Sequence, residues 1–147
     1  MCGIAGFNWR DEQLAIRMTD ALRHRGPDDE GIYADEDVSL GHRRLSILDL
    51  SKLGHQPMDY AHSGRRVVIT YNGEIYNFRE IRQQLEQKGY TFRSSTDTEI
   101  IPAAYLEWGT GCVEKFNGMW AFALYDSSNK QLLLSRDRFG EKPLYYY

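Results

Sequence analysis

The chain has 147 residues, a length typical of one domain, and its formal net charge of −3 at pH 7 gives no broad electrostatic attraction to nucleic acid or to an anionic membrane. Its longest apolar run, MWAFALY at 119–125, is far shorter than the ~20 residues of a membrane span, and the N-terminus lacks the basic region of a signal peptide. Its two cysteines, Cys2 and Cys112, form no disulfide framework, which favours a reducing, cytoplasmic location.

The first third of the chain predicts a strand, a helix and a pair of strands. Residues 3–9 (GIAGFNW) form a short apolar strand. The helix that follows ends at the RGP breaker of 25–27, and the apolar residues expected on its buried face are Leu14, Met18, Ala21 and Leu22. The segment GIYADEDVSLGHRRLSILDL at 31–50 then indicates two strands joined through an acidic turn at 35–37.

The segment RRVVITYNGEIYN at 65–77 predicts a β-branched strand followed by a helix. Asn77 and Glu80 have the spacing of a capping box at the start of that helix, and Gly89 marks its end. The side chains expected on its inner face are Phe78, Ile81 and Leu85.

A second strand and helix are expected next. Residues 90–93 predict a short strand. Thr96 and Glu99 repeat the capping-box spacing ahead of IIPAAYLEWG at 100–109, which predicts a helix there.

The last third predicts a meander, with MWAFALYD at 119–126, a turn at 127–130, QLLLS at 131–135 and then PLYYY at 143–147. Both faces of the strand at 119–125 are apolar, so we expect it to be covered on two sides. Two stacked antiparallel sheets with helices outside satisfy this, which gives a layered α+β sandwich. Because PLYYY ends on three aromatics with no closing turn, we expect residues 1–147 to be one domain of a longer protein.

The opening MCGIAGF places Cys2 where removal of Met1 would make it the first residue. A cysteine attacks as its thiolate, and an N-terminal cysteine has its own α-amine, with an ordinary pKa of about 7.7–8.0, as the base. Met1 must then be removed, because otherwise that nitrogen is an amide; we expect its removal since cysteine is small. The alternative is that Cys2 is a small buried residue at the start of an edge strand.

Asn72 and Gly73 form a candidate oxyanion hole for attack on an amide carbonyl. The donors would be the side-chain amide of Asn72 and the backbone N–H of Gly73, where the missing side chain allows close approach. The alternative is a hairpin turn, for which Asn-Gly is a strong signal. The helix predicted after this dipeptide, in place of a second strand, weakens the turn interpretation.

A zwitterionic amino-acid substrate also needs a cation for its carboxylate and an anion for its ammonium. Arg44 could hold the carboxylate through a bidentate pair of hydrogen bonds, and Glu74 or Asp97 could meet the ammonium. The alternatives are that Arg44 is a charge on a strand face and that Asp97 complements a helix dipole.

In this order, the segments resemble the class II glutamine amidotransferase domain, an N-terminal-nucleophile hydrolase, and most closely the N-terminal glutaminase half of glutamine-hydrolysing asparagine synthetases. The resemblance covers essentially the whole chain and rests on MCGIAG, RHRGPDDEG, GHRRLSILDL, YNGEIYN, STDTE, GMWAFALYD and RDRFGEKPLYY. It implies a four-layer αββα sandwich of two antiparallel sheets.

The resemblance also implies a role for each matching residue. Cys2 would be the nucleophile, Asn72 and Gly73 the oxyanion hole, and Arg44 the ligand of the glutamine carboxylate. The residues implied to line the remainder of the substrate site are Leu45, Ser46, Ile47 and Leu48 along one wall, with Glu74 and Asp97 at the ammonium.

The implied reaction hydrolyses L-glutamine to glutamate and ammonia through a thioester and needs no metal or cofactor in this domain. The sequence accordingly has no CxxC, HExxH or P-loop motif. ATP and magnesium are implied only for a C-terminal synthetase domain, which would make asparagine from aspartate in a full-length protein able to form a homodimer. Two alternatives stay open: an ammonia donor for another acceptor domain, and a non-catalytic glutamine-sensing module.

Overall fold

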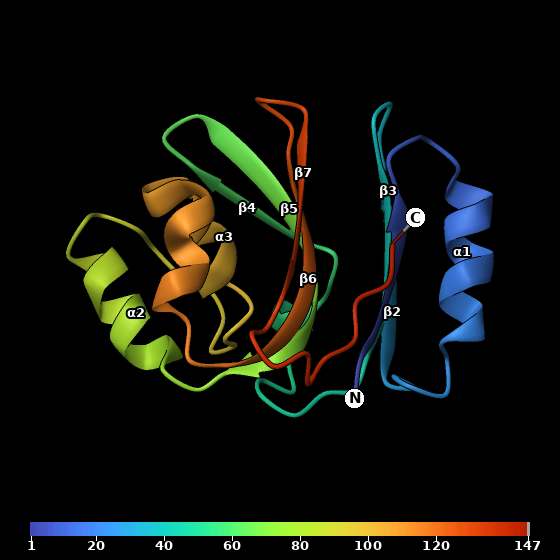
Figure 1. The fold of residues 1–147 in the computed structure, drawn as a ribbon, viewed down its shortest axis with the longest axis horizontal. Helices are drawn as coiled ribbons and strands as arrows, with labels where there is room; N and C mark the ends of the chain where they lie inside the picture. Colours follow the sequence, from blue (N-terminus) through green and yellow to red (C-terminus); the bar gives the residue numbers. More distant parts are fainter. Residues whose placement is uncertain (147) are drawn as a thin grey trace.

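The computed structural model describes residues 1–146, which form four layers (Figure 1). Two antiparallel sheets lie face to face, one helix covers the outer face of the first sheet, and two helices cover the outer face of the second. This arrangement confirms the α+β class and the αββα sandwich.

The first sheet has three antiparallel strands in the order β1-β3-β2. Its strands are β1 (Gly3–Phe7), β2 (Asp29–Ala34) and β3 (Ser39–Arg44). β2 and β3 form a hairpin around residues 35–38, so the two strands and the acidic turn predicted in this segment are confirmed.

Helix α1 (Glu12–Ala21) covers the first sheet with a different face from the predicted one. Its buried residues are Ala15 and Thr19, whereas Met18 is 40% exposed. The reason is close packing: Thr19 Oγ1 occupies the space that a side chain at Gly41 of β3 would need. A helix seated this closely on a strand buries its small residues and turns the longer Met18 outward.

The second sheet has four antiparallel strands in the order β4-β5-β6-β7. Its strands are β4 (Met58–His62), β5 (Arg65–Ile75), β6 (Gly118–Asp126) and β7 (Gln131–Arg136). β5 continues through Asn72 and Gly73, which excludes the alternative hairpin turn. Of the predicted meander, β6 and β7 are confirmed, but residues 143–146 form no strand, and Tyr147 lies outside the described residues.

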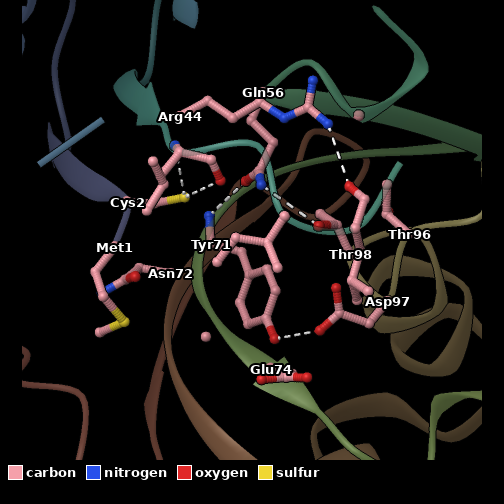
Figure 2. Close-up of a pocket in the computed structure, with 15 residues that line it drawn as sticks. Met1, Cys2, Arg44, Gln56, Tyr71, Asn72, Glu74, Thr96, Asp97 and Thr98 are labelled. Atoms are coloured by element: carbon pink, nitrogen blue, oxygen red, sulfur yellow. Dashed lines mark hydrogen bonds between the residues drawn. The ribbon is translucent and has the colours of Figure 1, made fainter. Parts of the chain in front are cut away.

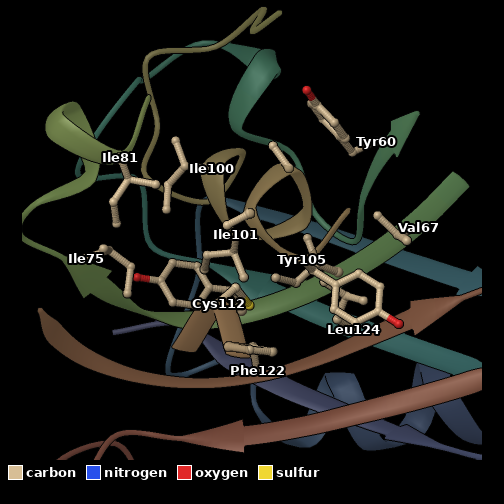
Figure 3. Packing of buried hydrophobic residues seen from close by; sticks show 14 of the residues in the cluster. Tyr60, Val67, Ile75, Ile81, Ile100, Ile101, Tyr105, Cys112, Phe122 and Leu124 are labelled. Atoms are coloured by element: carbon tan, nitrogen blue, oxygen red, sulfur yellow. The ribbon is translucent and has the colours of Figure 1, made fainter. Parts of the chain in front are cut away.

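Strand β6 is buried on both faces, as its composition predicts. Phe122 and Leu124 pack into the larger core, between the second sheet and its helices, and Ala123 and Tyr125 pack between the two sheets. Figure 3 shows side chains of the larger core around Cys112, whose thiol is free and fully buried.

The helices over the second sheet are α2 (Phe78–Glu86) and α3 (Ile100–Trp108), and two short 3₁₀ helices are η1 (Lys52–Gly54) and η2 (Gly109–Lys115). Ile81 and Leu85 of α2 are buried and Phe78 packs beside them, which confirms its inner face. The predicted capping box is wrong, because the Asn77 amide instead donates to Lys115 O at 2.9 Å and accepts from Asn117 N–H at 2.9 Å.

The segment before α3 also differs from its prediction. Residues 90–93, all within the described range, form no strand. The Thr96–Glu99 capping box is wrong as well, because the buried Glu99 carboxylate accepts hydrogen bonds from the backbone N–H groups of Arg93 and Ser94. These bonds fold residues 94–98 into a largely buried loop ahead of the helix.

Among residues 1–146, no helix is both long enough and apolar enough to cross a membrane.

Two buried hydrogen bonds join the sheets. His42 of β3 bonds through Nε2 to Tyr71 O of β5 at 3.0 Å, and Thr70 Oγ1 donates to Gly41 O at 3.1 Å. A carbonyl only accepts, so His42 carries its proton on Nε2. Within the described part of the chain, His42 Nδ1 is the one buried side-chain nitrogen or oxygen without a hydrogen-bond partner. Burial, reinforced by the Arg44 charge, lowers the pKa of His42 to about 4.

This lowered pKa predicts a loss of stability in mild acid. The unfolded chain binds a proton at His42 near its ordinary pKa of about 6.5, so the contribution is complete above that pH and is lost as the pH falls toward about 4. We expect urea unfolding to show a His42-dependent decrease on the order of 3 kcal/mol over that window. His42→Gln, which cannot titrate, should show a shallower pH dependence; an unchanged slope would contradict the assignment.

Candidate active site

A pocket opens at the end of the sandwich where the N-terminus lies (Figures 1 and 2). The segment before β1, the end of β3, the last part of β5 and the loop at 94–98 meet there. All of the predicted site residues except Ser46 line it: Cys2, Arg44, Leu45, Ile47, Leu48, Asn72, Gly73, Glu74 and Asp97. Groups up to 95 positions apart in the sequence, Cys2 and Asp97, thus share one cavity.

Cys2 reaches the pocket because it directly precedes β1. Gly3 pairs with Arg43 in the first sheet, so Cys2 lies beside the end of β3. Its half-buried sulfur accepts a hydrogen bond from the Leu45 N–H at 3.4 Å (Figure 2). The same thiol donates to the Leu45 carbonyl oxygen at 3.8 Å, so the backbone of Leu45 holds the sulfur at the pocket. The alternative of a thiol packed away in the core therefore does not describe Cys2, although it does describe Cys112.

Asn72 and Gly73 lie on the open edge of β5. Side chains of even-numbered residues face the first sheet, as the Thr70 bond to Gly41 shows, which directs Asn72 toward the same space as Cys2. The N–H groups of Tyr71 and Ile75 point away from β6, to Gln56 and Asp97. By the alternation of the strand, the N–H of Gly73 points to this same edge.

Gly73 can have no side chain at its place in the sheet. A Cβ there would collide with the Met119 carbonyl oxygen and would lie 2.7 Å from Trp120 Cα. These atoms belong to the backbone of β6 and cannot move aside cheaply. The glycine therefore keeps β5 and β6 in contact at the point where the pocket begins.

Arg44 provides a buried positive charge. Its guanidinium donates to three backbone carbonyls of the following loop, those of Leu48 at 3.5 Å, Ser51 at 2.9 Å, and Asp49. Gly54 makes room for it, since a Cβ there would overlap Arg44 Nη2. No carboxylate in residues 1–146 forms an ion pair with Arg44. A 6%-exposed cation held only by neutral acceptors is suited to an anionic ligand.

Negative charge lies on another wall of the pocket. The Asp97 carboxylate is 5% exposed, and its Oδ2 accepts from the Tyr71 hydroxyl at 2.7 Å and from the Ile75 N–H at 2.8 Å. The pKa of Asp97 is raised above its ordinary value. Burial is the main cause and the nearby charge of Glu74 adds to it, while these two hydrogen bonds act in the opposite direction. The pocket therefore combines one cationic side chain with two carboxylates, which is the charge pattern that a free amino acid requires.

Ser46 is the exception among the predicted lining residues. Its N–H donates to the Asp28 carboxylate at 2.8 Å, and it lines a neighbouring surface hollow with Asp29 and His55. The bond to Asp28 holds Ser46 at this hollow, while its neighbours Leu45 and Ile47 line the pocket.

Several lining residues were missed by the sequence reasoning: Met1, Gly54, Gln56, Tyr71, Thr96 and Thr98. Gln56 stands opposite Tyr71 in a continuation of the β4–β5 register, and its Oε1 accepts from the Tyr71 N–H at 2.7 Å. This long-range pairing is what indicates the place of Gln56 in the pocket, and no local sequence motif does so. Tyr71 is marked by no local motif either, because its role depends on the same register.

No group of three or more histidine, cysteine, aspartate or glutamate side chains that could hold a metal ion is present in the described part of the chain. The pocket brings a cysteine sulfur, the Asn72 amide and side chains of both charges together in one cavity. Such a set is suited to acyl transfer from an amino-acid amide.

The comparison with protein families is decisive. The family model described as "Glutamine amidotransferase domain" matches residues 1–147. The chain belongs to this family. Two solved structures share the fold of this glutamine amidotransferase domain. The Bacillus subtilis glutamine phosphoribosylpyrophosphate amidotransferase has a TM-score of 0.73 at 17% identity and covers 93% of this chain and 37% of its own. An allosteric regulatory enzyme of purine biosynthesis has a TM-score of 0.69 at 19% identity and covers 92% of this chain and 37% of its own.

Curated relatives of the domain have much higher identity. Asparagine synthetase [glutamine-hydrolyzing] 3 of Bacillus subtilis is 40% identical over 99% of this chain and 25% of the relative. A putative asparagine synthetase [glutamine-hydrolyzing] 2 of Methanocaldococcus jannaschii is 41% identical over 100% of this chain and 32% of the relative. The glutamine amidotransferase domain thus spans a quarter to a third of the length of these relatives.

The close approach at Gly73 yields a stability prediction. Gly73→Ala should lower the free energy of unfolding by about 1–3 kcal/mol, because the methyl group overlaps the β6 backbone. Gly111→Ala is the matched control, since a Cβ there meets nothing within 4 Å, and it should change stability by less than about 0.5 kcal/mol. Urea unfolding of both variants measures the difference, and equal midpoints would contradict this account of the β5–β6 contact.

Proposed function

We propose that this domain hydrolyses L-glutamine to glutamate and ammonia, with Cys2 as the nucleophile. The supporting observation is the position of the Cys2 sulfur in a pocket that also holds the Asn72 amide, the buried Arg44 cation and the Asp97 carboxylate. The family assignment makes glutamine the substrate that this charge pattern would select.

In the proposed mechanism, the Cys2 thiol gives its proton to the free α-amine of the same residue, and the thiolate attacks the side-chain carboxamide of glutamine. The C–N bond breaks, the proton passes to the leaving nitrogen, and ammonia departs from a γ-glutamyl thioester. Water then hydrolyses the thioester to glutamate and restores the thiol. Removal of Met1 is required, because in the peptide bond to Met1 the nitrogen of Cys2 cannot act as a base.

Asn72 and Gly73 would stabilise the tetrahedral intermediate. Their donors would be the Asn72 side-chain amide and the Gly73 N–H at the open edge of β5. Both residues line the pocket, and they directly follow Tyr71, whose carbonyl is bonded to His42 of the first sheet. Donors that are fixed before the reaction stabilise the transition state by about 2.7–4 kcal/mol each, because they need no reorganisation as charge develops.

The glutamine backbone would bind across the pocket. Arg44 would take the α-carboxylate, and Asp97 with Glu74 would take the α-ammonium. Leu45, Ile47 and Leu48 would form the wall between these groups, whereas Ser46 would contribute only by attaching the loop to Asp28.

We further propose that the ammonia serves asparagine synthesis. The names of the relatives at about 40% identity support this product over another acceptor or a glutamine sensor. The additional length of those relatives leaves room for a synthetase domain that would activate aspartate with ATP and Mg²⁺. Two free thiols suit a reducing cytoplasm.

The nucleophile assignment is tested with Cys2→Ala. In protein whose intact mass shows that Met1 is absent, this variant should release glutamate from glutamine at the background rate, about a thousandfold or more below wild type. Cys112→Ser is the matched control and should keep nearly full activity, since burial raises the pKa of Cys112 to about 12 and its thiol lies in the core. Equal activity of Cys2→Ala and wild type would overturn the proposal.

The carboxylate assignment is tested with Arg44→Ala and Arg44→Lys. Loss of a charge-assisted pair of hydrogen bonds should raise the KM for glutamine about 10–100-fold, with a smaller effect on kcat. Lysine keeps the charge without the planar geometry and should fall between wild type and alanine. Arg66→Ala is the control, because Arg66 forms an exposed pair with Asp59. An unchanged KM in both Arg44 variants would remove this residue from the site.

A further inference from the structure

Tyr71 lies in the pocket wall without a role in the mechanism above. Its side chain is 2% exposed and packs in the larger core, while its backbone is held by two other side chains. The N–H donates to Gln56 Oε1 at 2.7 Å, and the carbonyl accepts from His42 Nε2 at 3.0 Å. The Tyr71 backbone is therefore held by His42 of the first sheet and by Gln56, which lies just before β4 of the second sheet.

The Tyr71 hydroxyl links this fixed backbone to the carboxylate of Asp97. It donates to Asp97 Oδ2 at 2.7 Å, the contact drawn as a dashed line in Figure 2. The Ile75 N–H donates to the same oxygen at 2.8 Å. In residues 1–146, no hydrogen bond from another residue to Asp97 Oδ1 is found, and Asp97 lines the pocket. Both donors from other residues thus bind Oδ2, and the further donor to this carboxylate is the backbone N–H of Asp97 itself, so Oδ1 keeps lone-pair capacity for a ligand.

We propose that Tyr71 is a positioning residue for glutamine recognition, which holds the Asp97 carboxylate ionised and turned toward the α-ammonium of the substrate. This inference rests on the proposed function and deepens it. Tyr71 acts only through Asp97, and the hydrogen bond from its hydroxyl is the interaction that carries the effect.

The charges around Asp97 explain why such a donor is needed. Glu74 of β5 adds a second negative charge, and burial by itself favours the protonated carboxyl. The other charged or titratable groups that line the pocket are Arg44 from β3, the Cys2 thiol ahead of β1, and the N-terminal amine, which belongs to Met1 here and to Cys2 after removal of Met1. Burial raises the pKa of the Tyr71 hydroxyl well above its ordinary range, so it remains a donor throughout the neutral pH range.

Deleting this hydroxyl should change how recognition depends on pH. With one donor fewer, Asp97 becomes protonated closer to neutrality, and a neutral carboxyl attracts an ammonium weakly. The acidic limb of kcat/KM should therefore move toward higher pH. A hydroxyl that only satisfies the core would change stability and leave this limb in place, so the pH profile separates the two roles.

The test is Tyr71→Phe in the full-length, Met1-processed protein, assayed for glutamate release across the acidic and neutral range. We expect the KM for glutamine to rise about tenfold or more below neutrality, with kcat little changed, and the acidic limb to move by about one pH unit. Asp97→Asn, which cannot ionise, should lose the Tyr71-dependent part of the limb and keep the part set by protonation of the Cys2 α-amine. Tyr60→Phe is the matched control: Tyr60 is 4% exposed, its hydroxyl donates to the neutral Thr91 carbonyl at 3.0 Å, and the profile of the variant should match wild type.

Calorimetric binding of glutamine in the Cys2→Ala background, with and without Tyr71→Phe, separates this proposal from the proposed function. A Tyr71-dependent loss of affinity that grows as the pH falls supports the positioning role even if wild type releases no glutamate. If wild type hydrolyses glutamine and Tyr71→Phe keeps its KM, affinity and acidic limb, the positioning role alone is overturned. Absence of glutamine binding would overturn both proposals.

Discussion

Strand β5 extends beyond the end of its neighbour β4, and the site depends on that difference in length. β4 pairs with β5 only as far as Met58 opposite Ile69, so the backbone of β5 from residue 70 to residue 75 has no strand on one side. Buried N–H and C=O groups must find partners, and here side chains replace the missing strand. Gln56, His42 and Asp97 are the side chains that do so.

The side chains that replace the missing strand connect the layers of the sandwich to the pocket. His42 comes from the first sheet, Gln56 from the chain just ahead of β4, and Asp97 from the loop before α3. Each is fixed by a backbone group of β5, so the strand that holds Asn72 and Gly73 also sets the position of the Asp97 charge. One strand therefore positions both the proposed oxyanion hole and the carboxylate proposed to bind the ammonium.

The sequence alone predicted the layers well, because alternation and the doubly apolar strand at 119–125 depend on local composition. Local rules failed where a more distant partner competed: Asn77 and Glu99 bind backbone groups outside their expected caps, and Thr19 replaces Met18 in the α1 interface. For the site, motifs and family resemblance indicated the chemistry-bearing groups. Gln56 and Tyr71 were missed, since their role follows from a strand register that no short motif encodes.

The open edge of β5 has one further consequence. An uncovered strand edge invites pairing with a strand of another molecule, which is a common start of aggregation. In this domain three of the groups that such an intruder would use, the Tyr71 N–H and carbonyl and the Ile75 N–H, are already taken by side chains of the same chain. The residues that shape the pocket thereby also guard the protein against edge-to-edge association.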